Sequence, residues 1–159
     1  MRWWRVVVAA VVAAGAAAWV AVAFSQPVGS VEAEIPLGRG PCCVVVAGGS
    51  VWVGVHRSGA IDQVDPRTNK VVWTMQVPPQ SIDYGSLVGA YGSVWIVGFS
   101  GNVAGISRLD PRTHALVRVR GVAHANALVA LDGRLWASTD SGPFVYEINP
   151  STAKVVHDG

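Results

Sequence analysis

Three stretches of this chain repeat one short pattern around a tryptophan, and that repetition limits the possible folds more than any other feature. The stretches are AGGSVWVGV (47–55), AYGSVWIVG (90–98) and ALDGRLWAS (130–138). Their tryptophans follow one another at intervals of 43 and 41 residues, at Trp52, Trp95 and Trp136. A Trp that recurs with a Gly at such a period indicates an array of similar structural units.

A second landmark, a turn sequence, recurs downstream of each tryptophan. It reads VDPRTNKVV (64–72), LDPRTHALV (109–117) and INPSTAKVV (148–156), at intervals of 45 and 39 residues. An Asp or Asn followed by Pro starts a type I turn, because proline fixes one backbone angle and the Asx side chain accepts hydrogen bonds from the turn. We therefore interpret DPRT as a structural turn that is repeated because the unit is repeated.

Each repeat contains strand patterns and no helical pattern. In the second repeat we expect strands over residues 86–90, 94–99, 106–110 and 116–120, with a tight hairpin turn at Tyr91-Gly92. The second strand of a repeat is apolar on both faces, as in Val51-Trp52-Val53, which indicates cover on both sides. Four antiparallel strands per repeat, stacked between similar neighbours, are typical of the blades of a β-propeller.

The predicted fold class is all-β, with propeller blades of four antiparallel strands at about residues 41–77, 84–122 and 125–157, preceded by an N-terminal hydrophobic helix. Residues 31–37 alternate in character and are expected to form a lone outer strand, so residues 31–159 make a partial propeller. Closed propellers have about four to eight blades, so three leave the ring incomplete. Two explanations stay open: a truncated version of a longer propeller, or self-association of chains through uncapped end blades.

Residues 1–24 are expected to direct export. Arg2 and Arg5 precede an uncharged run at residues 6–24, almost all of it Ala and Val. Such a pattern is typical of a signal peptide or a signal-anchor, and this run nearly spans a bilayer. If uncleaved, it would hold the protein in the cell membrane as a single-pass protein with the propeller outside the cytoplasm. Cleavage after Ala21-Val22-Ala23 would leave the protein secreted; residues 25–30 are a short linker.

The charge balance excludes one class of partner. Beyond residue 24 the chain holds ten Lys and Arg against ten Asp and Glu, without a basic stripe. Nucleic-acid binding needs a clustered excess of positive charge, so nucleic acid is not an expected partner.

The pattern G-S-V-W-V followed by D-P-x-T-x-x-V-V resembles the YVTN-type β-propeller repeats of exported bacterial proteins, over about residues 31–159. It is also similar to the repeats of streptogramin B (virginiamycin B) lyase. The lyase resemblance implies an enzyme that opens a cyclic lactone with Mg²⁺ and a His on the channel face. The YVTN resemblance implies a binding or surface protein without an assigned reaction. The matching residues are all structural, so they specify the fold and leave the activity open.

Candidate site residues come from the loops that differ between the repeats. The connections into the first strand of each repeat and the turns after its second strand are expected to share one end of the propeller. There they gather seven polar residues: His56, Asp83, Tyr84, Asn102, His124, Asn126 and Asp140. Variable loops on a repeated scaffold are common places for binding sites.

His124 is the sharpest candidate. It could act as a general base or a metal ligand, with Asp83 on the neighbouring blade as its orienting partner. The alternative is an ordinary exposed loop histidine. His114, in the turn at the opposite end, and His157 are expected to be solvated. No short-spaced cluster of His, Cys and Asp predicts a zinc site.

The adjacent Cys42 and Cys43 are the only cysteines. We interpret them as small buried residues at the start of a strand. A strained vicinal disulfide, a bond to another chain or a reactive thiol are the alternatives.

Three functions stay open from the sequence. The first is an exported, membrane-tethered scaffold that binds an unknown small ligand or protein without a cofactor. The second is a lyase-like enzyme using Mg²⁺. The missing blades argue against it, because a site in the channel needs groups from around the ring. The third is an inactive fragment of a longer propeller.

Overall fold

A computed structural model of the chain describes residues 29–77, 87–98, 105–122, 124–140 and 142–156. The chain divides into two units, residues 1–33 and residues 34–159. Of the first unit only residues 29–33 are described, and they have no regular secondary structure. The expected hydrophobic helix and export segment lie outside the described residues. Among the described residues, no helix is long and apolar enough to cross a membrane.

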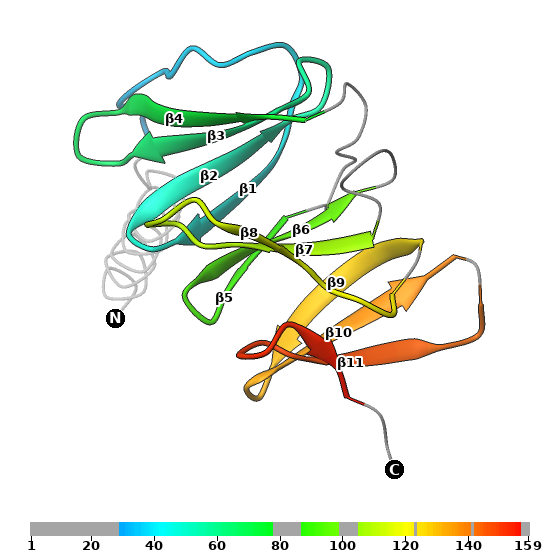
Figure 1. Cartoon of the computed structure of the whole chain (residues 1–159). Coiled ribbons are helices and arrows are strands. Elements are labelled where there is room, and N and C mark those ends of the chain that lie inside the picture. Colours follow the sequence, from blue (N-terminus) through cyan, green and yellow to red (C-terminus); the bar gives the residue numbers. More distant parts are fainter. Residues whose placement is uncertain (1–28, 78–86, 99–104, 123, 141, 157–159) are drawn as a thin grey trace, which may run out of the picture. The chain divides into compact units, whose positions relative to one another are not determined.

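The second unit contains three four-stranded antiparallel sheets, each ordered as its strands follow in the sequence (Figure 1). The first sheet consists of β1 (Pro41–Ala47), β2 (Ser50–Val55), β3 (Ala60–Asp65) and β4 (Lys70–Gln76). The second consists of β5 (Leu87–Ala90), β6 (Ser93–Gly98), β7 (Gly105–Leu109) and β8 (Leu116–Arg118). The third consists of β9 (Ala125–Leu131), β10 (Arg134–Thr139), β11 (Val145–Asn149) and β12 (Lys154–Val155). One sheet per sequence repeat is the arrangement that the repeat predicted.

The repeated tryptophan has the same structural role in the first two sheets. Trp52 and Trp95 are completely buried. The indole Nε1 of each donates a hydrogen bond to the backbone oxygen five residues earlier, Ala47 at 3.1 Å and Ala90 at 3.2 Å. Burial of a Trp is favourable when its N–H group has a partner, so the hairpin between the first two strands supplies both the space and the acceptor.

Two apolar clusters hold the three sheets together. The first joins Trp52 and Ile61 of the first sheet to Leu87, Val94 and Ile96 of the second. The second cluster joins the opposite face of the second sheet to the third sheet, through residues such as Trp95, Val97, Leu135, Ala137 and Ile148. The middle sheet is covered on both faces, and the sequence of its strand β6 is accordingly an almost continuous apolar run.

The expected outer strand over residues 31–37 does not form, since these residues have no regular secondary structure. An outer strand needs the inner strands of its own sheet as hydrogen-bonding partners, and each described sheet already carries a fourth strand. Instead, Ile35 and Leu37 pack on the first sheet, over a cluster of Val53, Val55, Ala60 and Val64. Ile35 and Leu37 therefore cover a sheet face without joining a ladder.

The DPRT segments form the same turn between the third and fourth strands of each sheet. Asp110 Oδ1 accepts hydrogen bonds from the backbone N–H groups of Arg112 and Thr113, at 2.8 and 2.9 Å. Asn149 makes the equivalent bonds to Ser151 and Thr152. The backbone N–H bonds from Thr113 and Arg112 lower the pKa of the Asp110 carboxyl, because they stabilise its charged form.

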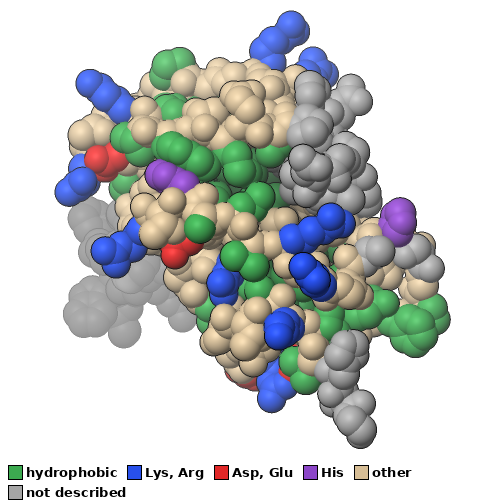
Figure 2. Space-filling model, viewed as in Figure 1, with side chains coloured by type: hydrophobic (Ala, Val, Ile, Leu, Met, Phe, Trp, Pro, Cys, Tyr) green, Lys and Arg blue, Asp and Glu red, His purple; other side chains and the backbone are tan. Residues whose placement is uncertain are grey.

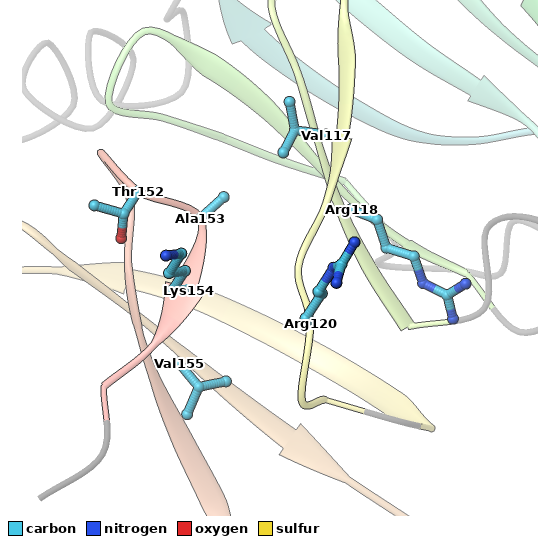
Figure 3. Close-up of a pocket in the computed structure, with 7 residues that line it drawn as sticks. All are labelled: Val117, Arg118, Arg120, Thr152, Ala153, Lys154 and Val155. Carbon is cyan, nitrogen blue, oxygen red and sulfur yellow. The ribbon is translucent and has the colours of Figure 1, made fainter.

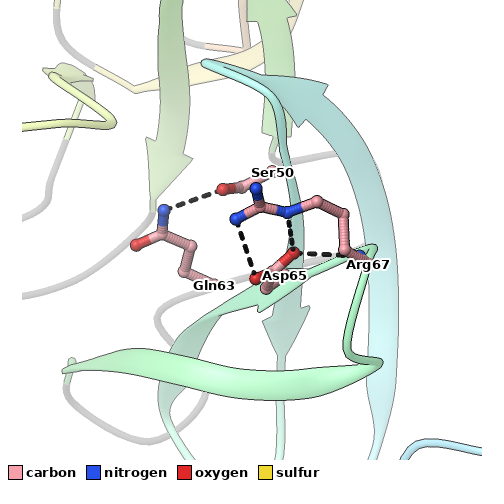
Figure 4. A network of polar contacts seen from close by, with 4 residues as sticks. All are labelled: Ser50, Gln63, Asp65 and Arg67. Atoms are coloured by element: carbon pink, nitrogen blue, oxygen red, sulfur yellow. Dashed lines mark hydrogen bonds and ion pairs between the residues drawn. The ribbon is translucent and has the colours of Figure 1, made fainter.

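The first turn adds an ion pair to this pattern. Asp65 accepts from Arg67 N at 2.9 Å and pairs with the guanidinium at 3.3 Å, which lowers the pKa of the Asp65 carboxyl (Figure 4). Beside it, Gln63 Nε2 donates to Ser50 Oγ at 2.9 Å and ties β3 to β2. All these bonds stay within one repeat, which confirms that DPRT is a structural turn.

Candidate functional site

Three of the predicted site residues lie together at one end of the third sheet. The backbone N–H of Asp140 donates to the carbonyl of His124 at 3.2 Å. Asn126 Oδ1 accepts from Ser138 Oγ at 2.6 Å. His124, Asn126 and Asp140 are all exposed, and His124 has a positive φ of 54° directly before β9. The connection into the first strand and the turn after the second strand therefore meet, as the topology of a blade predicts.

The same neighbourhood exists in the first sheet. His56 follows β2, and its backbone N–H donates to the carbonyl of Gly40, just before β1, at 2.9 Å. The remaining predicted residues, Asp83, Tyr84 and Asn102, lie outside the described residues. A pairing of His124 with Asp83 therefore stays a prediction, as does lyase-like chemistry with Mg²⁺. Among the residues that the structure describes, no group of three His, Cys, Asp or Glu side chains could hold a metal ion.

A different site is visible between the outer strands of the second and third sheets. A groove of about 430 Å³ lies there, and its lining includes three cationic side chains (Figure 3). The residues that line it are Val117, Arg118, Arg120, Thr152, Ala153, Lys154 and Val155. A second hollow, of about 620 Å³, continues along residues 118–122 and shares Arg118 and Arg120. Together these residues are called the cationic groove below.

Arg118 and Arg120 point away from the core because of the local strand geometry. Val119, between them, is buried, and its backbone N–H donates to the carbonyl of Ile106 at 2.8 Å. Because successive side chains of an extended chain alternate, Arg118 and Arg120 are turned outward and are exposed. Arg120 also forms a parallel bridge with Lys154, which fastens the outer edge of the second sheet to the outer edge of the third.

The third turn forms the opposite wall of the cationic groove. Arg108 Nη1 donates to the carbonyl oxygens of Pro150 and Ser151, at 2.9 and 3.0 Å. These bonds hold the turn that leads to Thr152 and Lys154. A charged donor to a backbone carbonyl stabilises more than a neutral one, so these bonds stabilise this wall of the groove.

The cationic groove has the electrostatics of an anion site. None of the described residues that line it is acidic, and three carry a positive charge. Figure 2 shows Lys and Arg side chains gathered over the second and third sheets. Arginine guanidinium groups match carboxylate and phosphate oxygens geometrically, and the apolar walls of Val117 and Val155 lower the local polarity. This arrangement can hold a carboxylate or a phosphate.

The sequence alone indicates one wall of this site. The alternation Val117-Arg118-Val119-Arg120 is typical of an outer strand exposed to water, and the two arginines are exposed. Lys154 is 34 residues further along the chain, in a separate repeat. Its place on the same groove as the arginines depends on how two blades stack, and a strand pattern does not specify that stacking.

His114 differs from its sequence interpretation. His114 was expected to be solvated, but its ring stacks on Trp73 at 4.0 Å between centroids and its Nε2 lies 2.9 Å from Gln63 Oε1. It is half-buried because the turn of the second sheet packs against the first sheet.

The two cysteines lie in β1. Cys43 is buried and Cys42 is half-buried, and their sulfur atoms are 3.0 Å apart. Cys42 Sγ also donates a hydrogen bond to the carbonyl of Gly54.

No protein-family model matches the sequence, and no curated protein matches it. Among solved structures, hydrazine synthase from Kuenenia stuttgartiensis has a TM-score of 0.61 at 17% identity, over 80% of this chain and 39% of that chain. BamB from Moraxella catarrhalis has a TM-score of 0.49 at 22% identity, over 72% and 34% of the two chains. Glutaminyl cyclase from Myxococcus xanthus has a TM-score of 0.45 at 20% identity, over 71% and 49%.

The likeness to hydrazine synthase carries the fold assignment. That protein contains a β-propeller, and the present chain spans 39% of its length. The three four-stranded antiparallel sheets, stacked through two apolar clusters, correspond to adjacent blades. The predicted fold class is confirmed for the described residues: the chain is built from β-propeller blades.

Proposed function

We propose that this protein is a non-catalytic β-propeller scaffold that binds a small anionic ligand in the cationic groove. The observation that carries the proposal is that Arg118, Arg120 and Lys154 line one groove of about 430 Å³. That volume lies within the range of about 300–1,000 Å³ for small-molecule sites. The ligand would carry carboxylate or phosphate groups, since these are what paired guanidinium groups recognise.

The balance of charge elsewhere supports this choice of ligand. The chain beyond residue 24 has equal numbers of basic and acidic residues, so three cations in one groove are a local concentration. Unlike the loop face around His124, the cationic groove is formed entirely by described residues from two different blades. A scaffold function fits it because positioned cations bind anions without needing a nucleophile or a general base.

The binding test uses inorganic pyrophosphate as the probe and the full chain as the protein. Isothermal titration at constant ionic strength is expected to show saturable binding. The double variant Arg118→Gln/Arg120→Gln is expected to bind at least about tenfold more weakly, because each hydrogen bond to a charged group contributes about 1.5–3 kcal/mol.

The chain offers a matched control for the lost charge. Arg67 and Arg112 are exposed turn arginines outside the groove lining, so Arg67→Gln/Arg112→Gln has the same net charge as the groove variant. Its affinity for pyrophosphate is expected to stay within about twofold of the parent protein. Equal weakening by the two double variants, or no saturable binding by the parent, would contradict the proposal.

We also propose that the scaffold is exported and tethered to the membrane through residues 6–24. Support comes from the sequence alone: two arginines followed by an uncharged apolar run. Alkaline carbonate extraction of cell membranes is the measurement. A tethered chain is expected to stay in the pellet at its full mass of 16.6 kDa. A soluble product shortened by the mass of residues 1–24 would show that the segment is a cleaved signal peptide.

A further inference from the structure

The two cysteines of β1 lie on the same side of their strand, although they are adjacent in the sequence. Along a regular strand, neighbouring side chains point to opposite faces. Most of β1 follows this rule, because Val45 packs against the apolar cluster shared by the first two sheets while Val44 and Val46 are 63% and 67% exposed. Cys43 belongs to that apolar cluster, so a regular strand would place Cys42 on the exposed face.

A β-bulge changes the direction of the Cys42 side chain. In the ladder of β1 and β2, Pro41 pairs with Val55. The next pair joins Cys43 to Gly54, so Cys42 is one residue more than the partner strand has at this point. A bulge turns side chains out of the regular alternation. Cys42 consequently packs against the same apolar cluster as Cys43, and the two sulfur atoms lie 3.0 Å apart.

Hydrogen bonds of the two thiols orient the sulfur atoms toward each other. The Cys42 thiol donates to the carbonyl of Gly54 at 3.3 Å. Each thiol has a single hydrogen, so Cys43 is the donor and Cys42 Sγ the acceptor in the contact between the two sulfur atoms. The Cys43 sulfur is thereby held against the Cys42 sulfur, within reach of any product that forms on it.

The two thiols differ in their access to solvent. Cys42 is partly exposed, whereas Cys43 is buried, with 9% of its surface exposed. A reagent from solvent therefore reaches Cys42 first, and Cys43 is placed as the resolving thiol. Exchange with the disulfide of another protein needs open access to the attacking sulfur. The partial cover of Cys42 thus favours a small oxidant.

From this geometry we propose that Cys42 and Cys43 form a peroxide-sensitive dithiol that closes reversibly to a vicinal disulfide. Cys42, as the thiolate, attacks one oxygen of hydrogen peroxide; the O–O bond breaks, water leaves, and Cys42 becomes a sulfenic acid. Cys43 then attacks the Cys42 sulfur, the S–O bond breaks, and a second water leaves with the Cys43 proton. The two thiols lose two electrons and two protons, and one hydrogen peroxide is reduced to two waters.

The spacing of adjacent residues makes this disulfide easy to reduce. Consecutive Cα atoms are about 3.8 Å apart across a trans peptide, below the range of about 4.4–6.8 Å that is usual for disulfides. Disulfides outside that range are strained, and strained disulfides are the labile ones. Closure also removes the S–H group that bonds to the carbonyl of Gly54. Both effects favour the return to two thiols when a thiol reductant is present.

The test starts from the reduced full chain in a mild detergent, treated with hydrogen peroxide. Mass spectrometry is expected to show that the peptide with Cys42 and Cys43 has lost two hydrogen atoms, while the chain keeps the mass of one copy. A mixture of reduced and oxidised glutathione is expected to restore both thiols. A disulfide between chains would overturn the proposal. So would a disulfide that persists in this mixture, or thiols that survive peroxide treatment sufficient to oxidise the urea-unfolded chain.

A matched control keeps two adjacent cysteines and removes their shared face. Cys42→Val/Val44→Cys leaves Cys43 next to a thiol on the opposite, exposed face of the regular part of β1. This variant is expected to form no disulfide within the chain. An intrachain disulfide yield equal to that of the parent would overturn the role of the bulge.

Single variants test the order of the two steps. Dimedone, which traps sulfenic acid, is expected to label Cys42 in Cys43→Ser at least about tenfold more than in the parent, because the neighbouring thiol no longer removes the sulfenic acid. Cys42→Ser is expected to be labelled much less than Cys43→Ser, since the remaining Cys43 is buried. Labelling in the reverse order would overturn the assignment of Cys42 as the reacting thiol. The disulfide measured in the parent chain does not depend on the stability of these variants.

Discussion

Trp95→Ala is expected to lower the free energy of unfolding by about 3–5 kcal/mol, the usual cost of deleting a buried aromatic side chain. Trp95 is completely buried in the cluster between the second and third blades, and its Nε1 bonds to the carbonyl of Ala90. The substitution therefore leaves a cavity at the interface of two blades and removes the donor from a half-buried acceptor.

Trp136→Ala is the matched control, because it removes the same residue type at the same repeat position. Trp136 is only half-buried, so its loss is expected to cost clearly less than that of Trp95. Urea unfolding followed by far-ultraviolet circular dichroism, in dilute protein where copies stay apart, measures both variants. Equal destabilisation by the two substitutions would contradict the stacking of blades described above.

Gly89→Ala is expected to destabilise the protein by about 3 kcal/mol, at the upper end of the usual cost of overpacking. A Cβ on Gly89 would overlap the carbonyl oxygen of Val46 and lie 3.1 Å from its carbonyl carbon. Gly89 is in β5 and Val46 in β1, so the contact joins the first strands of adjacent blades. The atom in the way belongs to the backbone of β1, where Val46 pairs with Val51, so moving it would disturb the β1–β2 ladder.

Gly142→Ala is the control for the general effect of adding a methyl group. Its Cβ would meet Phe144 Cδ2 at 3.6 Å, an ordinary contact, and a change within about 0.5 kcal/mol is expected. The urea midpoints of both variants give the comparison. If Gly89→Ala were as stable as Gly142→Ala, the two first strands would not approach as closely as the structure shows.

The repeat made most of the fold predictable. Trp52 and Trp95 are spaced by one blade because each fills the same space between hairpin and neighbouring sheet. Asp110 and Asn149 recur because each closes the same turn with its own side chain. These are local requirements, repeated with every unit, so the sequence displays them directly.

Contacts between blades were harder to predict, because they join residues far apart in the chain. His114 lies in a turn that reads as solvated, yet it stacks on Trp73 of the preceding blade. Residues 31–37 alternate like a strand, yet Ile35 and Leu37 use their apolar side chains for packing alone. In both cases the residue's environment is set by a neighbouring unit, and no pattern within one repeat specifies that neighbour.

The candidate site was likewise predictable where strand order determines it and not where it depends on contacts between blades. Blade topology correctly predicted that His124 and Asp140 would be neighbours, because that follows from strand order alone. To predict the cationic groove, one would need to know how the outer edges of the second and third sheets lie relative to each other. The bridge between Arg120 and Lys154 joins these two edges. Charge alternation on one strand predicted exposed arginines but not the lysine that completes the site.

The central claim, a propeller scaffold with an anion site between two blades, is tested most directly by nuclear magnetic resonance. Amide shifts of the isotopically labelled full chain are followed while inorganic pyrophosphate is added at constant ionic strength. We predict saturable shifts confined to residues 117–122 and 152–155, the two walls of the groove. Saturable shifts at His124, Asn126 and Asp140 with none in the groove would contradict the account and move the site to the loop face.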